Sequence, residues 1–162
     1  MTQFEEILRG LVAHHIDFVL VGGLAGVAHG SAYITSDLDI AYSRASSNIK
    51  RLVTYLRSIH AKLRGVPGDL PFVLDEKTFS FTMNFTFQTD LGDLDLLGEM
   101  AGVSPYAEVL KYSEVMNLYN MQIKVLSIDG LIQAKKAAGR PKDQMHLQEL
   151  LALRAKKKQL PL

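Results

Sequence analysis

The chain of 162 residues has no cysteine and no tryptophan, and its charges almost cancel, with 18 Lys and Arg against 17 Asp and Glu. Without cysteine there can be neither a disulfide scaffold nor a thiolate metal site, and the redox compartment stays open. A formal net charge of +1 provides no overall field that would attract nucleic acid or an anionic membrane.

Long apolar segments are also missing, because no run approaches the roughly 20 residues that a membrane-spanning helix needs. The N-terminal segment Met1 to Arg9 is polar and amphipathic, unlike a signal peptide. We therefore expect a cytoplasmic protein with no membrane partner. With 48% hydrophobic residues, the chain is long enough for one globular domain with a sizeable core.

Two adjacent glycines end an apolar run near the N-terminus. The segment 17–21 predicts a short buried strand, and 24–30 predicts a short helix that follows it. Glycines at such a turn let a ligand approach the backbone, and the start of the helix offers unpaired N–H groups to an anion. Gly22 and Gly23 therefore predict a turn that binds phosphate.

A pair of acids follows in the segment Ser36–Tyr42, which has the composition of a strand. Residues i and i+2 of a strand share a face, so Asp37 and Asp39 would point the same way, about 6 to 7 Å apart. Leu38 and Ile40 would then point to the core. A bound cation would relieve the repulsion between the carboxylates. A structural role, with Asp37 as a cap and Asp39 solvated, stays open from these residues alone.

A third acid lies on a predicted hairpin. Apolar and polar residues alternate strictly over 79–87, which predicts a long half-buried strand, and 90–92 supplies the turn. On the return strand, Asp95 lies between two leucines, a poor position for an acid without a partner. If this strand lies beside the first acidic strand, three carboxylates could converge on one or two metal ions. Asp93, on the same face, is the alternative third ligand.

The remaining elements follow from periodicity and capping signals. We predict helices near 4–12 and at 46–60, 106–112, 127–138 and 143–157, short strands at 115–118 and 122–126, and a loop at 65–74. The expected fold class is α/β (α+β), a mixed sheet with helices mainly on one face. Residues 1–126 would form the core, and 127–162 a helical C-terminal extension packed on it.

This pattern resembles the nucleotidyltransferase superfamily, whose fold is shared by DNA polymerase beta and kanamycin nucleotidyltransferase. The superfamily has two small residues after a hydrophobe, then acid-hydrophobe-acid, then a third acid on a later strand. The matching segments here are Gly22-Gly23, Asp37-Leu38-Asp39 and Leu94-Asp95-Leu96. The sequence is most similar to the bacterial branch around the AbiEii-type toxins, through Gly22-Gly23-Leu24-Ala25, His29-Gly30 and Thr35. Relatives often carry Arg where this chain has Tyr33.

The resemblance continues to the C-terminal part and covers about residues 4–152. A helix that carries Lys135 and the turn Arg140-Pro141-Lys142-Asp143 are similar to the lysine helix and Arg-x-Lys-Asp turn of that branch. In a functional interpretation, Lys135 and Arg140 face a triphosphate. In a structural one, Asp143 caps the last helix. The sequence leaves both open.

The resemblance implies a nucleotidyltransferase that uses Mg²⁺ or Mn²⁺ and moves a nucleotide from a nucleoside triphosphate to an acceptor hydroxyl. The implied catalytic and metal-binding residues are Asp37, Asp39 and Asp95. The residues assigned to the nucleotide are Gly22, Gly23, Ser36, Lys135 and Arg140. The acceptor would be a tRNA 3′ end or a protein, and the protein would belong to a toxin–antitoxin pair with a cognate partner.

Two other interpretations were weighed. A catalytically silent nucleotide-binding or antitoxin-like module is favoured by Tyr33 and by the short chain, whereas the three intact carboxylates argue against it. A Rossmann-type nucleotide-binding domain is disfavoured, because the segment Gly22–Gly26 lacks the Gly-x-Gly-x-x-Gly spacing.

Overall fold

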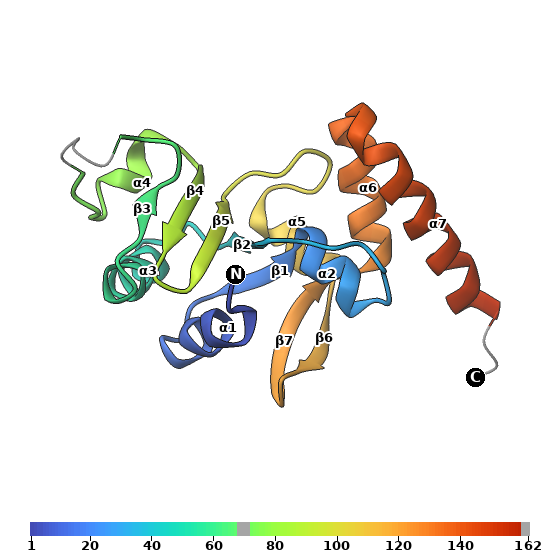
Figure 1. Ribbon diagram of the computed structural model, residues 1–162, viewed down its shortest axis with the longest axis horizontal. Helices are drawn as coiled ribbons and strands as arrows, with labels where there is room; N and C mark the ends of the chain where they lie inside the picture. The colour runs from blue at the N-terminus through green and yellow to red at the C-terminus, as the bar shows by residue number, and fades with distance from the viewer. Residues whose placement is uncertain (68–71, 160–162) are drawn as a thin grey trace.

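The computed structural model describes residues 1–67 and 72–159. The loop predicted at 65–74 and the C-terminal part predicted to reach residue 162 therefore extend beyond the described residues. Within those residues, seven strands form one mixed sheet in the order β3-β4-β5-β2-β1-β7-β6 (Figure 1). The expected mixed α/β architecture is confirmed. No helix in these two ranges has the length and apolar character of a membrane span.

The centre of the sheet joins the glycine turn to both acidic strands. Strand β1 (Phe18–Val21) pairs antiparallel with β2 (Asp37–Tyr42), and β2 pairs parallel with β5 (Gly92–Leu97). On its other side, β1 pairs parallel with β7 (Met121–Leu126), which forms a hairpin with β6 (Ser113–Leu118). Strands β2 and β5, far apart in sequence, are therefore direct neighbours.

The hairpin of β4 (Asn84–Thr89) and β5 forms as expected, but the predicted strand at 79–87 is wrong in its first half. Residues Thr78–Phe81 form the short helix α4 instead. The Asp75 carboxylate accepts a hydrogen bond from the Thr78 amide at 3.2 Å, and this local turn outweighs the alternating pattern. Phe79 is buried while Phe81 is 86% exposed, so the two do not share a strand face. The short strand β3 (Lys62–Leu63) pairs with β4 at the edge of the sheet.

Helices α1 (Phe4–Ala13) and α3 (Ser46–Ser58) pack together on one face of the sheet. Their apolar stripes are buried, because helical spacing places those residues on one side. The fully buried side chains there are Ile7, Leu8, Leu11, Leu52 and Leu56. Leu38 and Ile40 of β2 are also fully buried, as predicted, which leaves the acids of β2 on the opposite face.

The remaining helices lie toward the half of the sheet formed by β1, β7 and β6 (Figure 1). They are α2 (Gly22–Ala28), α5 (Tyr106–Lys111), α6 (Ile128–Ala138) and α7 (Gln144–Gln159). Ser127 caps α6 as predicted, because its hydroxyl accepts a hydrogen bond from the Gly130 amide at 3.1 Å. The helix ends at Gly139, whose φ of 62° is left-handed.

Between α6 and α7 the residues Pro141–Asp143 form one 3₁₀ turn, η1. The expectation that Asp143 caps the last helix is wrong. Its carboxylate instead accepts hydrogen bonds from Lys135 and Arg140, because the turn brings both cations to it. The turn therefore holds the Lys135 side chain of α6 in place.

Candidate active site

Four aspartates lie together on the open face of β2 and β5. The parallel register places Asp39 beside Asp95 and Asp37 beside Asp93, while Leu38 between them points to the core. Adjacent strands are about 4.8 Å apart, so these carboxylates are close neighbours. We call this group of four the acid face. It contains the three acids singled out in the sequence and also Asp93, the alternative ligand.

The glycine turn packs directly against the acid face. Gly22 has a φ of 69°, and a side chain there would collide with the carboxylate of Asp39. A Cβ atom on Gly23 would lie 2.7 Å from the Cβ of Thr35. Gly22 therefore allows the backbone to approach Asp39, and Gly23 allows it to approach Thr35, more closely than a residue with a side chain would permit.

Asp39 has the most perturbed environment of the four acids. Burial raises the pKa of Asp39 to about 7, and the charge of Asp95, a hydrogen bond with Asp95 and the charge of Asp37 act in the same direction. A hydrogen bond with the Gly23 backbone opposes this rise only in part. Near neutral pH the acid face therefore retains a proton that a bound cation would displace.

An arginine that the sequence analysis missed lies among these acids. Arg64 follows β3, and its Nη2 is 2.7 Å from Oδ1 of Asp95. Its Nε and Nη1 lie 3.6 Å from Asp93 and 3.8 Å from Asp37. The same Nη2 donates to the carbonyl of Phe87 at 2.8 Å, which fixes the guanidinium over the sheet. One cation is thus shared by three acids, and none of these ion pairs includes Asp39.

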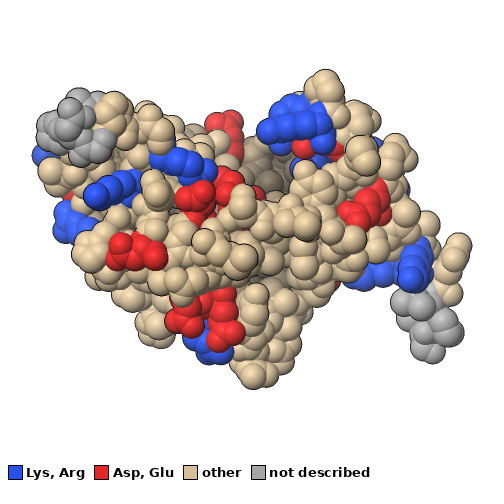
Figure 2. Space-filling view, in the orientation of Figure 1, with Lys and Arg blue, Asp and Glu red and all other residues tan. Residues whose placement is uncertain are grey.

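A cavity of about 520 Å³ lies over the acid face. One wall is formed by acids and the glycine turn, and the opposite wall by cations from α6 and η1. The lining includes Gly22, Gly23, Asp37, Asp39, Asp95, Lys135, Arg140 and Lys142. Figure 2 shows a hollow at the top of the molecule, with acidic atoms on its left and basic atoms on its right.

The cationic wall is anchored by a buried carboxylate, Asp143, which is 4% exposed. It accepts hydrogen bonds from Lys135 Nζ at 3.0 Å and from Arg140 Nε at 2.7 Å. Burial by itself would raise the pKa of Asp143, but the bonds from Arg140 and Lys135 outweigh it and lower the pKa. We call Lys135, Arg140, Lys142 and Asp143 the cationic turn. It carries more positive than negative charge.

Ser36 is the one assigned nucleotide-binding residue that does not line this cavity. It is exposed, and its hydroxyl donates a hydrogen bond to Oδ1 of Asp37 at 3.0 Å. The structure therefore places Ser36 beside a carboxylate of the acid face and brings the other assigned residues together around one cavity.

The carboxylate oxygens of the acid face are suitable ligands for a hard divalent cation. Within residues 1–67 and 72–159, no three His, Cys, Asp or Glu side chains stand ready to hold a metal, and Arg64 lies among three of the acids. Carboxylate oxygens are nevertheless the ligands that Mg²⁺ and Mn²⁺ prefer. Burial and, after it, the charges of Asp95 and Asp37 raise the pKa of Asp39, and the ion pairs of Arg64 do not include this carboxylate.

Two histidines near the site make packing and hydrogen-bonding contacts within the protein. His29 is buried, and its Nε2 lies 2.9 Å from the carbonyl of Leu126. His146 is also buried, with 4% of its surface exposed. It stacks on Tyr33 with ring centroids 4.6 Å apart, so Tyr33 packs against α7.

No known family model matches the chain, and no curated protein matches its sequence. Solved structures do match, and they define the fold as that of nucleotidyltransferases. One is a Thermotoga maritima protein assigned as a nucleotidyltransferase, 16% identical, with TM-score 0.57, 94% of this chain and 96% of that chain covered.

Two further matches are antibiotic-modifying proteins. The lincosamide antibiotic adenylyltransferase LnuA, with lincomycin bound, is 12% identical with TM-score 0.60, and 93% of this chain and 95% of that chain are covered. ANT(2″)-Ia, in complex with adenylyl-2″-tobramycin, is 13% identical with TM-score 0.57, and the coverage is 94% and 93%. At these identities the likeness concerns the fold, and the activity of this chain must be argued from its own site.

Proposed function

We propose that this protein is a metal-dependent nucleotidyltransferase that transfers a nucleotide from a nucleoside triphosphate to an acceptor hydroxyl. The observation that carries the proposal is the opposition of the acid face and the cationic turn across one cavity of about 520 Å³. A triphosphate with a divalent cation needs both surfaces, because the cation binds carboxylates and the phosphates bind cations. The shared fold of the structural matches supports the same class of reaction.

Each site residue singled out in the sequence has a role in this proposal. Asp37 and Asp39 would hold Mg²⁺ or Mn²⁺, whose positive charge would offset that of the phosphates. Gly22 and Gly23 leave room for phosphate oxygens beside the backbone. Ser36 would keep the Asp37 carboxylate in place through its hydrogen bond. Two further side chains, Lys135 and Arg140, would bind the phosphates while Asp143 fixes their positions.

Asp95 lies where the acceptor would react. In the proposed step, the acceptor oxygen forms a bond to the α-phosphorus, and the bond from that phosphorus to the bridging oxygen of pyrophosphate breaks. The hydroxyl proton passes to the Asp95 carboxylate, and pyrophosphate leaves with the electron pair. Arg64 must move away from Asp95 for this carboxylate to accept the proton or to help hold a second metal ion.

The acceptor is the least defined part of the proposal. The sequence resemblance to AbiEii-type toxins favours a tRNA 3′ end or a protein, with a cytoplasmic toxin–antitoxin role and a cognate partner. The names of LnuA and of the tobramycin complex instead favour hydroxyl groups of small molecules. These two kinds of acceptor require different surfaces next to Asp95.

A silent nucleotide-binding module is the second candidate, and the position of Arg64 favours it. An arginine shared by Asp37, Asp93 and Asp95 could hold the acid face permanently without metal. The two candidates differ in one respect: the module would bind a nucleoside triphosphate but would transfer nothing.

The test is incubation of the purified protein with each α-labelled nucleoside triphosphate, Mg²⁺ or Mn²⁺, total tRNA and a protein extract. We expect label in an acceptor and release of pyrophosphate, both lost in Asp39→Asn. The matched control is Asp90→Asn, an exposed aspartate of the β4–β5 turn that pairs with His60 outside the site. Triphosphate binding without any transfer would favour the silent module, and absence of triphosphate binding would refute both.

A further inference from the structure

A second cavity, of about 610 Å³, opens between the edge of the sheet and α4. Six of its thirteen described lining residues are apolar, and they come from β3, the loop residues after it, α4 and β4. These apolar residues are Leu63, Val66, Phe72, Val73, Phe81 and Phe85. We call this cavity the edge cleft. Its volume lies in the range of roughly 300 to 1,000 Å³ that is usual for small-molecule sites.

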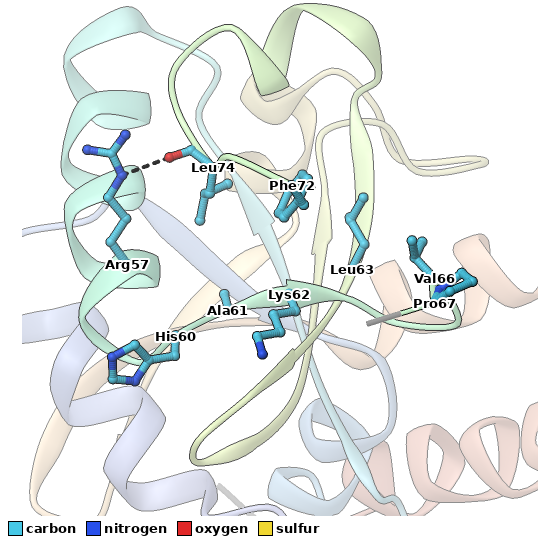
Figure 3. A pocket seen from close by; sticks show the side chains of 9 residues that line it. All are labelled: Arg57, His60, Ala61, Lys62, Leu63, Val66, Pro67, Phe72 and Leu74. Carbon is cyan, nitrogen blue, oxygen red and sulfur yellow. Dashed lines mark hydrogen bonds between the residues drawn. The ribbon is translucent and has the colours of Figure 1, made fainter. Parts of the chain in front are cut away.

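A smaller cavity of about 340 Å³, shown in Figure 3, lies beside the edge cleft. Leu63, Val66 and Phe72 line both cavities, so these three side chains lie between them. The smaller cavity shares no lining residue with the cavity over the acid face. Of the two, the edge cleft is the one connected with the candidate active site.

That connection has two parts. Asn84 lines both the edge cleft and the cavity over the acid face, so the two spaces meet at this residue. Thr86, another lining residue, pairs directly with Asp95 in the β4–β5 ladder. Directly opposite residues of an antiparallel pair lie on the same face, about 5 Å apart. A molecule seated in the edge cleft would therefore present its nearest group to Asp95.

Exposed side chains of the cleft indicate that it binds an apolar group. Phe81 is 86% exposed and Val73 is 73% exposed. Single exposed apolar residues are common, but here they border one cleft together with Phe72 and Phe85. Covering them with an apolar ring or chain would remove this surface from water, at about 25 cal/mol per Å².

The charges of the cleft indicate an uncharged occupant. Its described lining has three charged residues, Arg64, Asp75 and Lys77. Arg64 is already paired with acids, and the charges of Asp75 and Lys77 cancel. A nucleic acid acceptor would need several free cations to neutralise its phosphates, and these described residues offer no such stripe.

We propose that the edge cleft is the acceptor site, and that the acceptor is a small, uncharged alcohol with an apolar ring or chain. This inference rests on the proposed nucleotidyl transfer and specifies its second substrate. The apolar body would lie among Phe72, Phe81 and Phe85. The hydroxyl would project past Asn84 toward Asp95, opposite the phosphates held by the cationic turn.

A fluorescent probe with this chemistry is 2-naphthyl β-D-glucopyranoside, which has an apolar ring, hydroxyl groups and no charge. We expect saturable binding to the wild-type protein, measured by fluorescence anisotropy. Phe81→Asp and Val73→Asp should each weaken binding at least tenfold, because they place a charge among apolar groups. The matched control is Met145→Asp on α7, since Met145 is an 85% exposed apolar residue outside the cleft lining. It should bind the probe within twofold of wild type.

Two further measurements separate this inference from the proposed function. ATP affinity with Mg²⁺, measured by calorimetry, should be the same in wild type and both cleft variants. With α-labelled triphosphates, the glucoside should become labelled by the wild type and at least tenfold more slowly by the variants. Thermal melts identify any variant that has lost its fold. If one cleft variant does not fold, the other one provides the test of the acceptor site.

The possible results are distinct. If ATP binds but the glucoside does not, or binds equally to wild type and cleft variants, the acceptor assignment is refuted while nucleotidyl transfer stands. If the cleft variants lose binding of total tRNA instead, the cleft serves a macromolecule and the inference is equally overturned. If no nucleoside triphosphate binds the wild type, the proposed function itself fails.

Discussion

The acid face contains a partly buried carboxylate, Asp39, and the cationic turn contains a buried one, Asp143, but the charges around the two carboxylates are opposite. Asp39 has Asp37 and Asp95 as neighbours, and its pKa is raised to about 7. Asp143 has Lys135 and Arg140 as neighbours, and its pKa is lowered. Burial acts in the same direction on both, so the sign of the neighbouring charges decides the difference.

The comparison shows what each surface lacks. Three of the four carboxylates of the acid face share the guanidinium of Arg64, and the fourth, that of Asp39, is not paired with it, so this surface can accept further positive charge. In the cationic turn, the carboxylate of Asp143 is shared by two cations while Lys142 also lines the cavity, so this surface can accept negative charge. The two face each other, which is the arrangement that a metal-bound polyphosphate requires.

The largest effect is expected when a proposed metal ligand of the acid face is removed. Asp39→Asn keeps the size of the side chain and removes its charge, so the proposed metal ligand is lost. We expect the rate of nucleotide transfer to fall about a thousandfold, or about 4 kcal/mol in activation free energy. Initial rates with labelled triphosphate give the value, and Asp90→Asn should keep the wild-type rate. A fall of less than tenfold would remove Asp39 from the metal site.

The pH dependence of the free energy of unfolding tests the charge of Asp39 independently of catalysis. Its pKa is about 7 when folded and about 3.8 when unfolded, so between these values the folded state binds more protons. Without metal, stability should therefore fall as the pH rises from 4 to 8, by up to about 4 kcal/mol from this group.

Denaturant unfolding of wild type and Asp39→Asn at several pH values measures this contribution as the difference between the two proteins. The variant should be the more stable one at pH 8. Mg²⁺ at pH 8 should stabilise only the wild type, through preferential binding to the folded state. Parallel pH profiles of the two proteins would show that Asp39 has an ordinary pKa.

The cationic turn is tested by removing its carboxylate. Asp143→Ala should cost about 2 kcal/mol, because Lys135 and Arg140 lose the buried partner that holds them. Lys135→Ala leaves the Arg140–Asp143 pair in place and should cost about 1 kcal/mol. Both variants should bind ATP about tenfold more weakly. Thermal melts and calorimetric titrations separate the two effects, and unchanged ATP affinity in Lys135→Ala would exclude that residue from the site.

Much of the acid face could be predicted from the sequence, because strand periodicity acts locally. The alternation of Asp37, Leu38 and Asp39 placed both carboxylates on one face, and the leucines around Asp95 did the same for the third. The pairing of β2 with β5 was a hypothesis from the shared motif, and the register of Asp39 with Asp95 agrees with it.

The wrong predictions have physical causes that the periodicity of the sequence does not reveal. At Thr78, a side chain–backbone turn with Asp75 replaced the expected strand by a helix. At Asp143, two cations brought by the turn after α6 replaced the expected cap. Arg64 was missed because no motif surrounds it. It reaches the acids only after β3 pairs with β4, which depends on contacts between distant parts of the chain.

The smallest expected effect comes from Arg64, the one cation that the acid face already has. A divalent cation that binds Asp37 and Asp95 must displace its guanidinium, so Arg64→Gln should tighten Mn²⁺ binding about fivefold, or by about 1 kcal/mol. Without metal, the variant should be less stable by a similar amount, because three acids lose their counter-ion. The metal-induced rise in melting temperature should therefore be larger than in wild type.

Titration of Mn²⁺ by electron paramagnetic resonance and thermal melts with and without metal measure both changes. The matched control is Arg9→Gln, because Arg9 forms an exposed ion pair with Glu5 on α1, away from the acid face. It should leave Mn²⁺ affinity unchanged. Weaker Mn²⁺ binding in Arg64→Gln would show the opposite role: the hydrogen bond from Arg64 to the Phe87 carbonyl would then support the geometry of the site, and competition with the metal would be secondary.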